Sequence, residues 1–465
     1  MAKQVSVNVR MFQVGELGDC FHLCFKEEGK ESNVLIDCGS FRNSEKSKTR
    51  LQSIVSFLNK DLGDKKFDVV VGTHQHNDHL SGFVHCEDLF KGRIKQTWLS
   101  WLDDPKDNLA RTISKDHKSL VDSVRSLKDH LKQPSMKATV EVLNDVLGFY
   151  NAAGDDPKIP SMGIDILKTI GENSVQYLSP GNMLNLPGLS AETVKVYVLG
   201  PPRNQKLLFD ITANKDETYD PHLAYANASA ARFLSALKNY DSSSERDRSE
   251  EQFPFSKNYK LTAAKAEKEI VGKYKNQRNH WRNIDGDWLQ TANRLGLYLD
   301  TYTNNTSLVL AFELVKTGKV LLFVGDAQTG NWLSWKDIQW TNTPKNFTSK
   351  NLLQNTVLYK VGHHASHNAT LVEGLESMEH PELVAMIPVD DTDPNIMKVN
   401  GWKMPAKNLY KRLKVKTKYR VLRMDQGFAD ECQPQKNNAK SKWNELPNKP
   451  KINSANFFIE YTVQG

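Results

Sequence analysis

Cysteine is scarce in this chain, which has five cysteines among its 465 residues. The number is odd and no Cys-x-x-Cys pair occurs, so nothing in the spacing indicates a disulfide framework. Cys20 and Cys24 lie in an apolar stretch, where a buried free thiol is the simplest interpretation. This cysteine usage fits a reducing compartment.

Long apolar runs are also missing. The longest, Ser307 to Val315, contains Glu313 and is too short to span a bilayer. The N-terminal residues lack the apolar core of a signal peptide. We therefore expect a cytoplasmic protein that does not associate with a membrane.

The sequence contains no internal repeat of fixed period and no nucleophile motif such as Gly-x-Ser-x-Gly. Hydrophobic residues make up 39% and charged residues 25% of the chain, which is typical of a soluble protein with a sizeable core. The length allows two or three domains, or one large domain with insertions. A net charge of +7 permits an anionic substrate without requiring one.

Hydrophobic periodicity predicts an α/β protein. Residues 5–11 alternate like a half-buried strand, whereas Leu51, Ile54, Val55 and Leu58 mark one face of a helix. Further strands are expected at 20–25, 33–36, 67–72, 194–199, 307–315, 319–324, 357–362 and 383–388. We divide the chain into a first half of the core (1–100), a helical insertion (101–190), a core strand (191–202), a polar and helical insertion (203–300), and a second half of the core with a C-terminal tail (301–465).

Four potential metal ligands fall within six residues, directly after the apolar stretch 67–72. They are His74, His76, Asp78 and His79. Imidazole and carboxylate groups suit zinc, manganese or iron. His74 and His76 are two residues apart and can reach one ion from a tight loop, whereas Asp78 and His79 can reach a second ion. A solvated histidine-rich loop is the alternative, but this pattern after an apolar strand rarely arises by chance.

This motif resembles the signature of the metallo-β-lactamase superfamily. The resemblance implies an αββα sandwich with the metal loop at one edge of two facing sheets. It also implies a metal-bridging carboxylate after a later strand, which Gly325-Asp326 matches, and a further histidine, which His363 or His364 matches. Asp78 and Asp326 are then the candidate catalytic carboxylates.

One branch of the superfamily is closer: the hydrolase domain of ComEC-type DNA-internalisation proteins and its free-standing relatives. The strings that resemble it are 14–20, 34–39, 304–307, 361–366 and 420–427. Ala365 stands where that branch usually has glycine. The likeness covers about 1–100, 194–202 and 303–430, and the two insertions are not covered. Many superfamily members carry another histidine where Leu199 to Pro202 lie here, which leaves fewer ligands for the first metal.

The resemblance assigns further roles. Asp19 and Asp37 are expected to accept hydrogen bonds from the ligand imidazoles, with ordinary turn carboxylates as the alternative. Asn305, Ser307, Ser366 and His367 are candidate substrate-binding residues, although His367 could equally face solvent. Other residues are expected to serve structure: His22, His85 and Cys86 by packing or sheet hydrogen bonds, and His117 and His130 as surface residues. His222 is left open.

The function expected from these motifs is metal-dependent hydrolysis by one or two ions, zinc or manganese. A bound divalent ion lowers the pKa of water to about 7 and so supplies hydroxide. The resemblance to the ComEC-like branch favours a phosphodiesterase or nuclease, with nucleic acid as partner. Alternatives are a lactonase or other small-ester hydrolase, and a non-catalytic protein that retains its metal site. His76 argues against a di-iron oxidoreductase, in which glutamate usually occupies that position.

Two regions outside the motif could serve a nucleic-acid substrate. Basic residues interleave with tyrosine at 257–275 and 403–418, although solvated helices show the same pattern. The insertion 203–300 is expected to form part of the substrate entrance, because both its ends adjoin motifs of the site.

Overall fold

Two facing β-sheets of eight strands each form the centre of the protein. The structure is a computed structural model, and it describes residues 4–130, 137–150, 159–172, 175–208, 261–274, 299, 301–341, 343–344, 346–398, 401–428, 442–454 and 457–465. The predicted α/β class is confirmed.

The first sheet joins the start of the chain to its last strands. Its order is β15-β16-β1-β2-β3-β4-β5-β6. The strands are β1 (Ser6–Phe12), β2 (Cys20–Glu27), β3 (Lys30–Cys38), β4 (Val69–Val71), β5 (Thr97–Ser100), β6 (Gln176–Leu178), β15 (Lys451–Asn453) and β16 (Phe458–Gln464). β3 to β6 are parallel, and the other neighbours are antiparallel. The C-terminal segment, expected as a tail, thus completes this sheet.

The second sheet has the order β14-β13-β12-β11-β10-β9-β8-β7. Its strands are β7 (Met183–Asn185), β8 (Val194–Gly200), β9 (Val309–Leu314), β10 (Lys319–Phe323), β11 (Thr356–Lys360), β12 (Val384–Ile387), β13 (Val421–Arg423) and β14 (Gly427–Phe428). β10 to β13 are parallel. Each sheet therefore contains a parallel half, and the candidate ligands follow strands of those halves.

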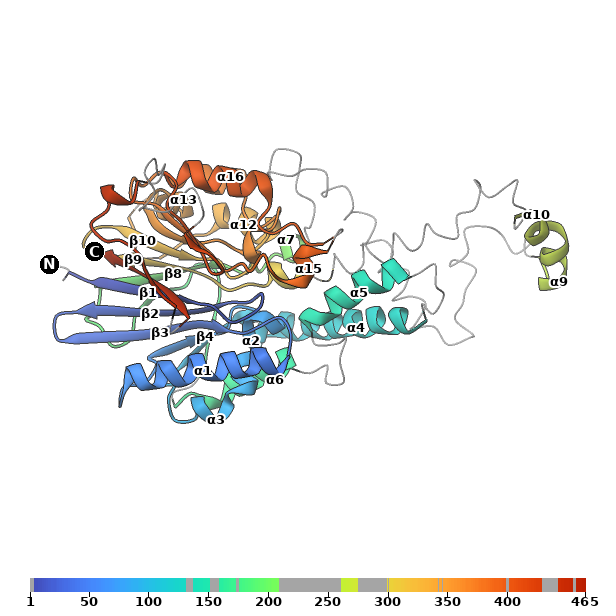
Figure 1. Cartoon of the computed structure of the whole chain (residues 1–465), viewed down its shortest axis with the longest axis horizontal. Coiled ribbons are helices and arrows are strands. Elements are labelled where there is room, and N and C mark those ends of the chain that lie inside the picture. The colour runs from blue at the N-terminus through green and yellow to red at the C-terminus, as the bar shows by residue number, and fades with distance from the viewer. Residues whose placement is uncertain are drawn as a thin grey trace.

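Helices cover the outer faces of both sheets, which gives four layers (Figure 1). α1 (Glu45–Leu62), α3 (Glu87–Phe90) and α6 (Ile159–Ile170) lie outside the first sheet, and α13 (Ser349–Gln354) and α16 (Lys407–Lys416) lie outside the second. Between the sheets, aromatic side chains meet: the ring centroids of Phe21 and Phe323 are 5.6 Å apart, and those of Phe25 and Phe312 are 5.5 Å apart.

The sequence periodicities agree with these elements. The four apolar residues expected on one helix face, Leu51, Ile54, Val55 and Leu58, are all buried in α1. β1 alternates buried and half-buried residues as expected.

The remaining short helices are α2 (Asn77–His85), α7 (Gln205–Leu208), α9 (Ala263–Ala266), α10 (Gly272–Tyr274), α12 (Thr329–Ser334), α14 (Val372–Glu376) and α15 (Pro394–Met397).

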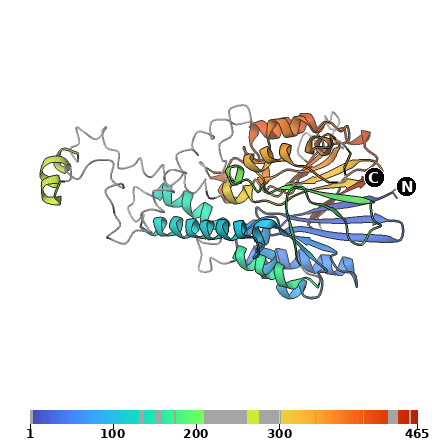
Figure 2. The same ribbon diagram turned by 180° about the vertical axis from the view of Figure 1, so that it is seen from behind.

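The insertion 101–190 carries two long helices, α4 (Asn108–His130) and α5 (Lys137–Phe149), which pack on each other and extend beyond one end of the sheets (Figure 2). The segment is not wholly helical, however. It ends in β6 and β7, which form one edge of each sheet.

Most of the insertion 203–300 lies outside the described residues. The two described ends of this insertion are held by hydrogen bonds. The Leu208 carbonyl accepts one from Asn305, and the Leu299 carbonyl accepts one from Tyr150. The described piece 261–274 lies away from both sheets (Figures 1 and 2). Among all described helices, none has the length and apolarity needed to cross a membrane.

The aromatic contacts between the sheets should dominate the stability of the fold. Replacing Phe21, which is 1% exposed, with Ala should lower the free energy of unfolding by about 3–5 kcal/mol, because a cavity remains between the sheets. Urea denaturation followed by tryptophan fluorescence measures this. Met397→Ala, at a side chain that is 71% exposed, is the control and should change stability by less than about 0.5 kcal/mol. Equal effects of the two changes would contradict this account of the core.

Candidate metal centre

The predicted ligands come together where the parallel strands of the two sheets end. Asp37 belongs to the end of β3, and the His74 loop follows β4. Asp326 follows β10, and the two adjacent histidines follow β11. Because parallel strands in one sheet end at the same edge, residues remote in sequence gather there. α2 begins inside the motif, and this first turn fixes Asp78 and His79.

Four side chains form a compact buried group: Asp78, His79, Asp326 and His364. Each offers one ligand atom, and these atoms lie within 4.8 Å of one another. His79 Nε2 is 3.2 Å from Asp326 Oδ2, and His364 Nε2 is 3.0 Å from Asp78 Oδ2. All four residues are fully buried. The group thus draws ligands from both sheets and could hold a metal ion.

His363 points elsewhere. Its Nδ1 lies 2.8 Å from Gln328 Nε2 and 2.7 Å from Ser366 Oγ, outside the four-residue group. The backbone explains the divergence, because His363, His364 and Ala365 all adopt positive φ angles in this turn. Ala365, at φ 63°, occupies the left-handed region that favours glycine, the residue usual there in the ComEC-like branch. Of the two histidines left open by the sequence, His364 therefore fits the metal group.

His74 and His76 form a second, adjoining pair. His74 Nε2 lies 3.0 Å from His76 Nδ1, close to the separation of about 3.3 Å that two nitrogens bound to one tetrahedral zinc would have. Among the described residues, no third His, Cys, Asp or Glu lies near enough to join them as a group of three. This agrees with the histidine missing at Leu199 to Pro202.

Hydrogen bonds hold the ligand rings in position. His79 Nδ1 lies 2.7 Å from Asp37 Oδ2, and Asp37 also accepts hydrogen bonds from the Thr73 amide and hydroxyl groups. His364 Nδ1 donates to the Pro388 carbonyl at 2.6 Å. In both rings the Nδ1 atom is therefore occupied and Nε2 faces the centre. Asp37 thus has the orienting position that the resemblance implies.

The second ligand pair is oriented by neighbours that the sequence reading did not identify. His76 Nε2 lies 3.1 Å from the hydroxyl group of Tyr150, the residue that follows α5. Tyr150 donates to the Leu299 carbonyl or contacts Thr303 Oγ1 at 2.6 Å. His74 Nδ1 lies 3.1 Å from Thr73 Oγ1 and 3.3 Å from Ser307 Oγ. The helical insertion therefore contributes directly to the site.

Lys360 is the other important residue that sequence reasoning missed. Its ammonium group is buried, contacts Asp19 Oδ2, lies 3.2 Å from Asp326 Oδ1 and donates to the Gly325 carbonyl at 2.7 Å. Asp19 therefore pairs mainly with Lys360, and its oxygens lie 3.8 Å from His79 and 3.9 Å from His364. A lysine in an otherwise apolar strand was the available signal.

The buried charges favour a cation. Four carboxylates surround the centre: those of Asp19, Asp37, Asp78 and Asp326. The buried ammonium group of Lys360 contacts two of them, Asp19 and Asp326. Burial alone raises the pKa of Asp326, but His79, Lys360 and His364 outweigh burial and hold that pKa well below its ordinary value.

The pKa values of the buried His79 and His76 are shifted in opposite directions. Burial lowers the pKa of His79, but Asp326, Asp37 and Asp19 outweigh it and raise that pKa well above its ordinary value. Burial lowers the pKa of His76 to about 3. His79 Nε2, Asp78 Oδ1 and Asp326 Oδ2 are buried without a hydrogen-bond partner among the described residues. A divalent ion would satisfy such atoms and offset the excess negative charge, so these residues fit one.

Three of the candidate substrate-binding residues, Asn305, Ser307 and Ser366, form hydrogen bonds inside the protein. Asn305 accepts a hydrogen bond from the Asn331 amide, and Ser307 Oγ accepts one from the Asp326 amide at 3.0 Å. Ser366 Oγ contacts His363 and Asn368. In the described structure these side chains position the metal ligands and their turns, and only His367 is partly exposed.

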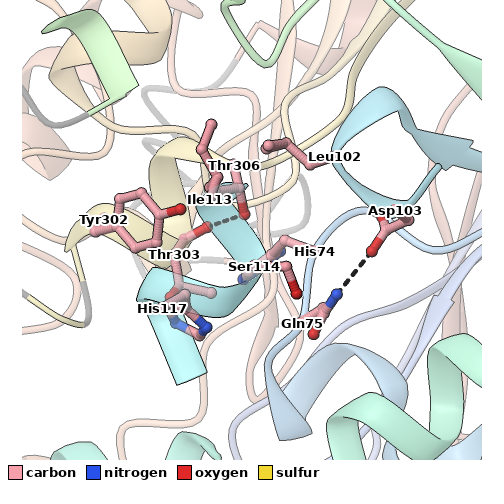
Figure 3. Close-up of a pocket in the computed structure, with 10 residues that line it drawn as sticks. All are labelled: His74, Gln75, Leu102, Asp103, Ile113, Ser114, His117, Tyr302, Thr303 and Thr306. Atoms are coloured by element: carbon pink, nitrogen blue, oxygen red, sulfur yellow. Dashed lines mark hydrogen bonds between the residues drawn. The ribbon is translucent and has the colours of Figure 1, made fainter. Parts of the chain in front are cut away.

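Most discounted residues have the structural environment expected of them. His22 is buried with Nε2 3.1 Å from Asn33 Oδ1, and His85 Nε2 lies 2.7 Å from Asn43 Oδ1. Cys86 is buried. His130 ends α4, and His222 lies outside the described residues. His117 differs from expectation, because it is not a free surface residue: it lines a pocket together with His74 (Figure 3) and lies 2.9 Å from Thr303 Oγ1.

Comparisons with known proteins add no assignment: no family model matches the sequence, and no curated protein is significantly similar to it.

The two adjacent histidines should differ in metal binding. His364→Ala should weaken binding of Zn²⁺ or Mn²⁺ to the four-residue group at least about 100-fold, because one of its ligands is removed. His363→Ala is the matched control and should retain the stoichiometry of the wild type. Isothermal titration calorimetry of protein stripped with chelator measures both. Loss of binding in His363→Ala alone would show that the wrong histidine has been assigned.

The hydroxyl group of Tyr150 should matter for the His74–His76 pair. Tyr150→Phe removes the partner of His76 Nε2 and should weaken metal binding at that pair about 10- to 100-fold, with the four-residue group unaffected. Tyr197→Phe removes a hydroxyl group that donates to Glu313 and serves as the control. Titration with cobalt(II), followed by visible absorption, separates the two sites. Unchanged binding in Tyr150→Phe would refute this orienting role.

Proposed function

We propose that this chain is a metal-dependent hydrolase of the metallo-β-lactamase fold that cleaves phosphodiesters, with nucleic acid as its substrate. The buried group Asp78, His79, Asp326 and His364 carries this proposal. Its members come from three separated motifs, in the order that the resemblance implies. The two facing sheets with outer helices accord with the sandwich of that superfamily.

The ion proposed for this group is zinc or manganese, with one or two ions bound. A bound divalent ion supplies a water of lowered pKa and a positive charge that stabilises developing oxyanions. The chain's own residues supply the rest. Asp326 Oδ2 lies near the Nε2 atoms of both His79 and His364. The other oxygen of Asp326, Oδ1, is held by Lys360. Asp37 keeps His79 Nε2 directed at the centre.

Water is the nucleophile of this proposal, because no serine or cysteine lies in a nucleophile motif. Asp78 Oδ2 is held by His364, whereas Asp78 Oδ1 is without a partner among the described residues. The proton for the leaving oxygen would come from Asp78, after it has accepted one from the attacking water, or from a water held by the ion. No covalent intermediate with the protein is needed.

A cytoplasmic location is part of the same proposal. Cys20, Cys24, Cys38 and Cys86 are free and buried, which suits a reducing compartment.

Asp326→Asn should separate catalysis from folding. The change keeps the size of the side chain but removes charge from a fully buried position, so turnover should fall about 100-fold or more. The assay compares bis-p-nitrophenyl phosphate, single-stranded DNA and RNA, with Mn²⁺ or Zn²⁺ supplied. Asp68→Asn, at a buried carboxylate before β4 that accepts hydrogen bonds from the Asn33 amide and Lys95, is the control for lost charge.

Three results would count against the proposal. Full activity in Asp326→Asn would remove this residue from the centre. A wild-type protein that opens lactones or thioesters but cleaves no phosphodiester would leave a hydrolase of small esters as the function. A wild type that binds metal but hydrolyses neither class would favour a non-catalytic protein.

A further inference from the structure

Two adjoining cavities lead away from the metal loop along α4. The inner one, of about 40 Å³, is lined by His74 and Gln75 of the loop, by His117 of α4 and by Tyr302 and Thr303 (Figure 3). The outer one, of about 450 Å³, shares Gln75, Ser114 and His117 with the first. The shared residues make the two cavities one continuous cleft.

One face of α4 forms a wall of this cleft. Ser114, Lys118, Val121 and Arg125 line it at spacings of three or four residues, which places them in one row along the helix. From Ser114 to Arg125 the helix rises about 16 Å. The cleft therefore runs from a metal ligand to a point well beyond the reach of a single small substrate.

The cationic groups lie at the outer end. Lys118 is exposed and Arg125 is half-buried, and neither forms an ion pair with a described residue. Asp122 is the one acidic residue of α4 in the outer lining. Lysine and arginine are the usual phosphate-binding side chains. Two cationic side chains in this row, with no ion-pair partner in the described part of the chain, suit a chain of phosphates.

We propose that this cleft binds the backbone of a single-stranded nucleic acid, with Lys118 and Arg125 contacting phosphates on one side of the cleaved bond. The inference rests on the proposed function and places the scissile phosphate at the inner cavity, beside His74. It goes further by naming the strand and the residues of the helical insertion that select it. Those residues lie in the segment that the family resemblance does not cover.

The dimensions favour a single strand. The inner cavity beside His74 is small, with Leu102, Ile113 and Tyr302 in its lining, so a phosphodiester has to leave a duplex to enter it. A mononucleotide in that cavity would leave the outer cleft, and its two cations, without a partner. An oligonucleotide fills both.

The test uses Lys118→Glu/Arg125→Glu and a fluorescent single-stranded 15-mer, measured by anisotropy in EDTA so that no turnover occurs. Binding should weaken about tenfold or more at low salt. The slope of log K against log salt should fall by about 1.4, because each single-strand phosphate contact contributes about 0.7. Asp122→Lys should strengthen binding.

The matched control is Lys46→Glu/Lys60→Glu, which reverses two exposed charges on α1, outside both basic stretches. Equal weakening by the control, or an unchanged salt slope in the Lys118/Arg125 variant, would overturn the proposal. So would tighter binding of a duplex through the same two residues. The protein could bind the strand through Lys118 and Arg125 and yet cleave no phosphodiester. That result would refute the proposed function but not the proposed binding cleft. If the protein cleaves the strand but neither residue affects binding, only the proposal about the cleft is refuted.

Discussion

The contact between Asp78 and His364 joins the two halves of the molecule at the point where chemistry is proposed. Asp78 lies in the first turn of α2 below one sheet, and His364 follows β11 of the other, yet their side-chain atoms are 3.0 Å apart in a fully buried position. A carboxylate buried in this way is costly unless positive charge accompanies it. The way the sheets meet therefore favours positive charge at this junction, from protonated imidazoles or from a metal ion.

Lys360 meets that requirement only in part. It pairs with Asp19 and with one oxygen of Asp326, and it leaves the other oxygen directed at His79 and His364. The centre is thus divided: one side is neutralised permanently by the protein, and the other retains ligand atoms without hydrogen-bond partners. This division accounts for the opposed pKa directions of the buried histidines, since His79 faces several carboxylates and His76 faces aromatic rings.

The sequence predicted the α/β class, the strands beside the site and the ligand cluster, because these depend on local patterns: period-2 alternation, apolar runs and a dense metal-ligand motif. It could not choose between His363 and His364, since that choice depends on three consecutive positive φ angles. Tyr150, His117 and Lys360 were missed for a different reason. Each belongs to no motif and reaches the site only through packing, two of them from an insertion outside the resemblance. A strand-end motif also could not reveal that the side-chain oxygens of Asn305 and Ser307 accept hydrogen bonds from neighbouring backbone amides, and their role in substrate binding stays a prediction.

The pairing of β1 with β16 has a consequence for biosynthesis. β1 is made before the other strands of its sheet, but one of its two hydrogen-bonding neighbours, β16, is made after them. At translation rates of about 5–20 residues per second, the edge of β1 waits on the order of half a minute or more for its partner. During that interval the growing chain exposes a strand edge flanked by buried apolar residues, a surface prone to pairing with other chains. A ribosome-bound holdase, or simply slow release of the nascent chain, would protect the protein at the stage when it is most exposed to aggregation.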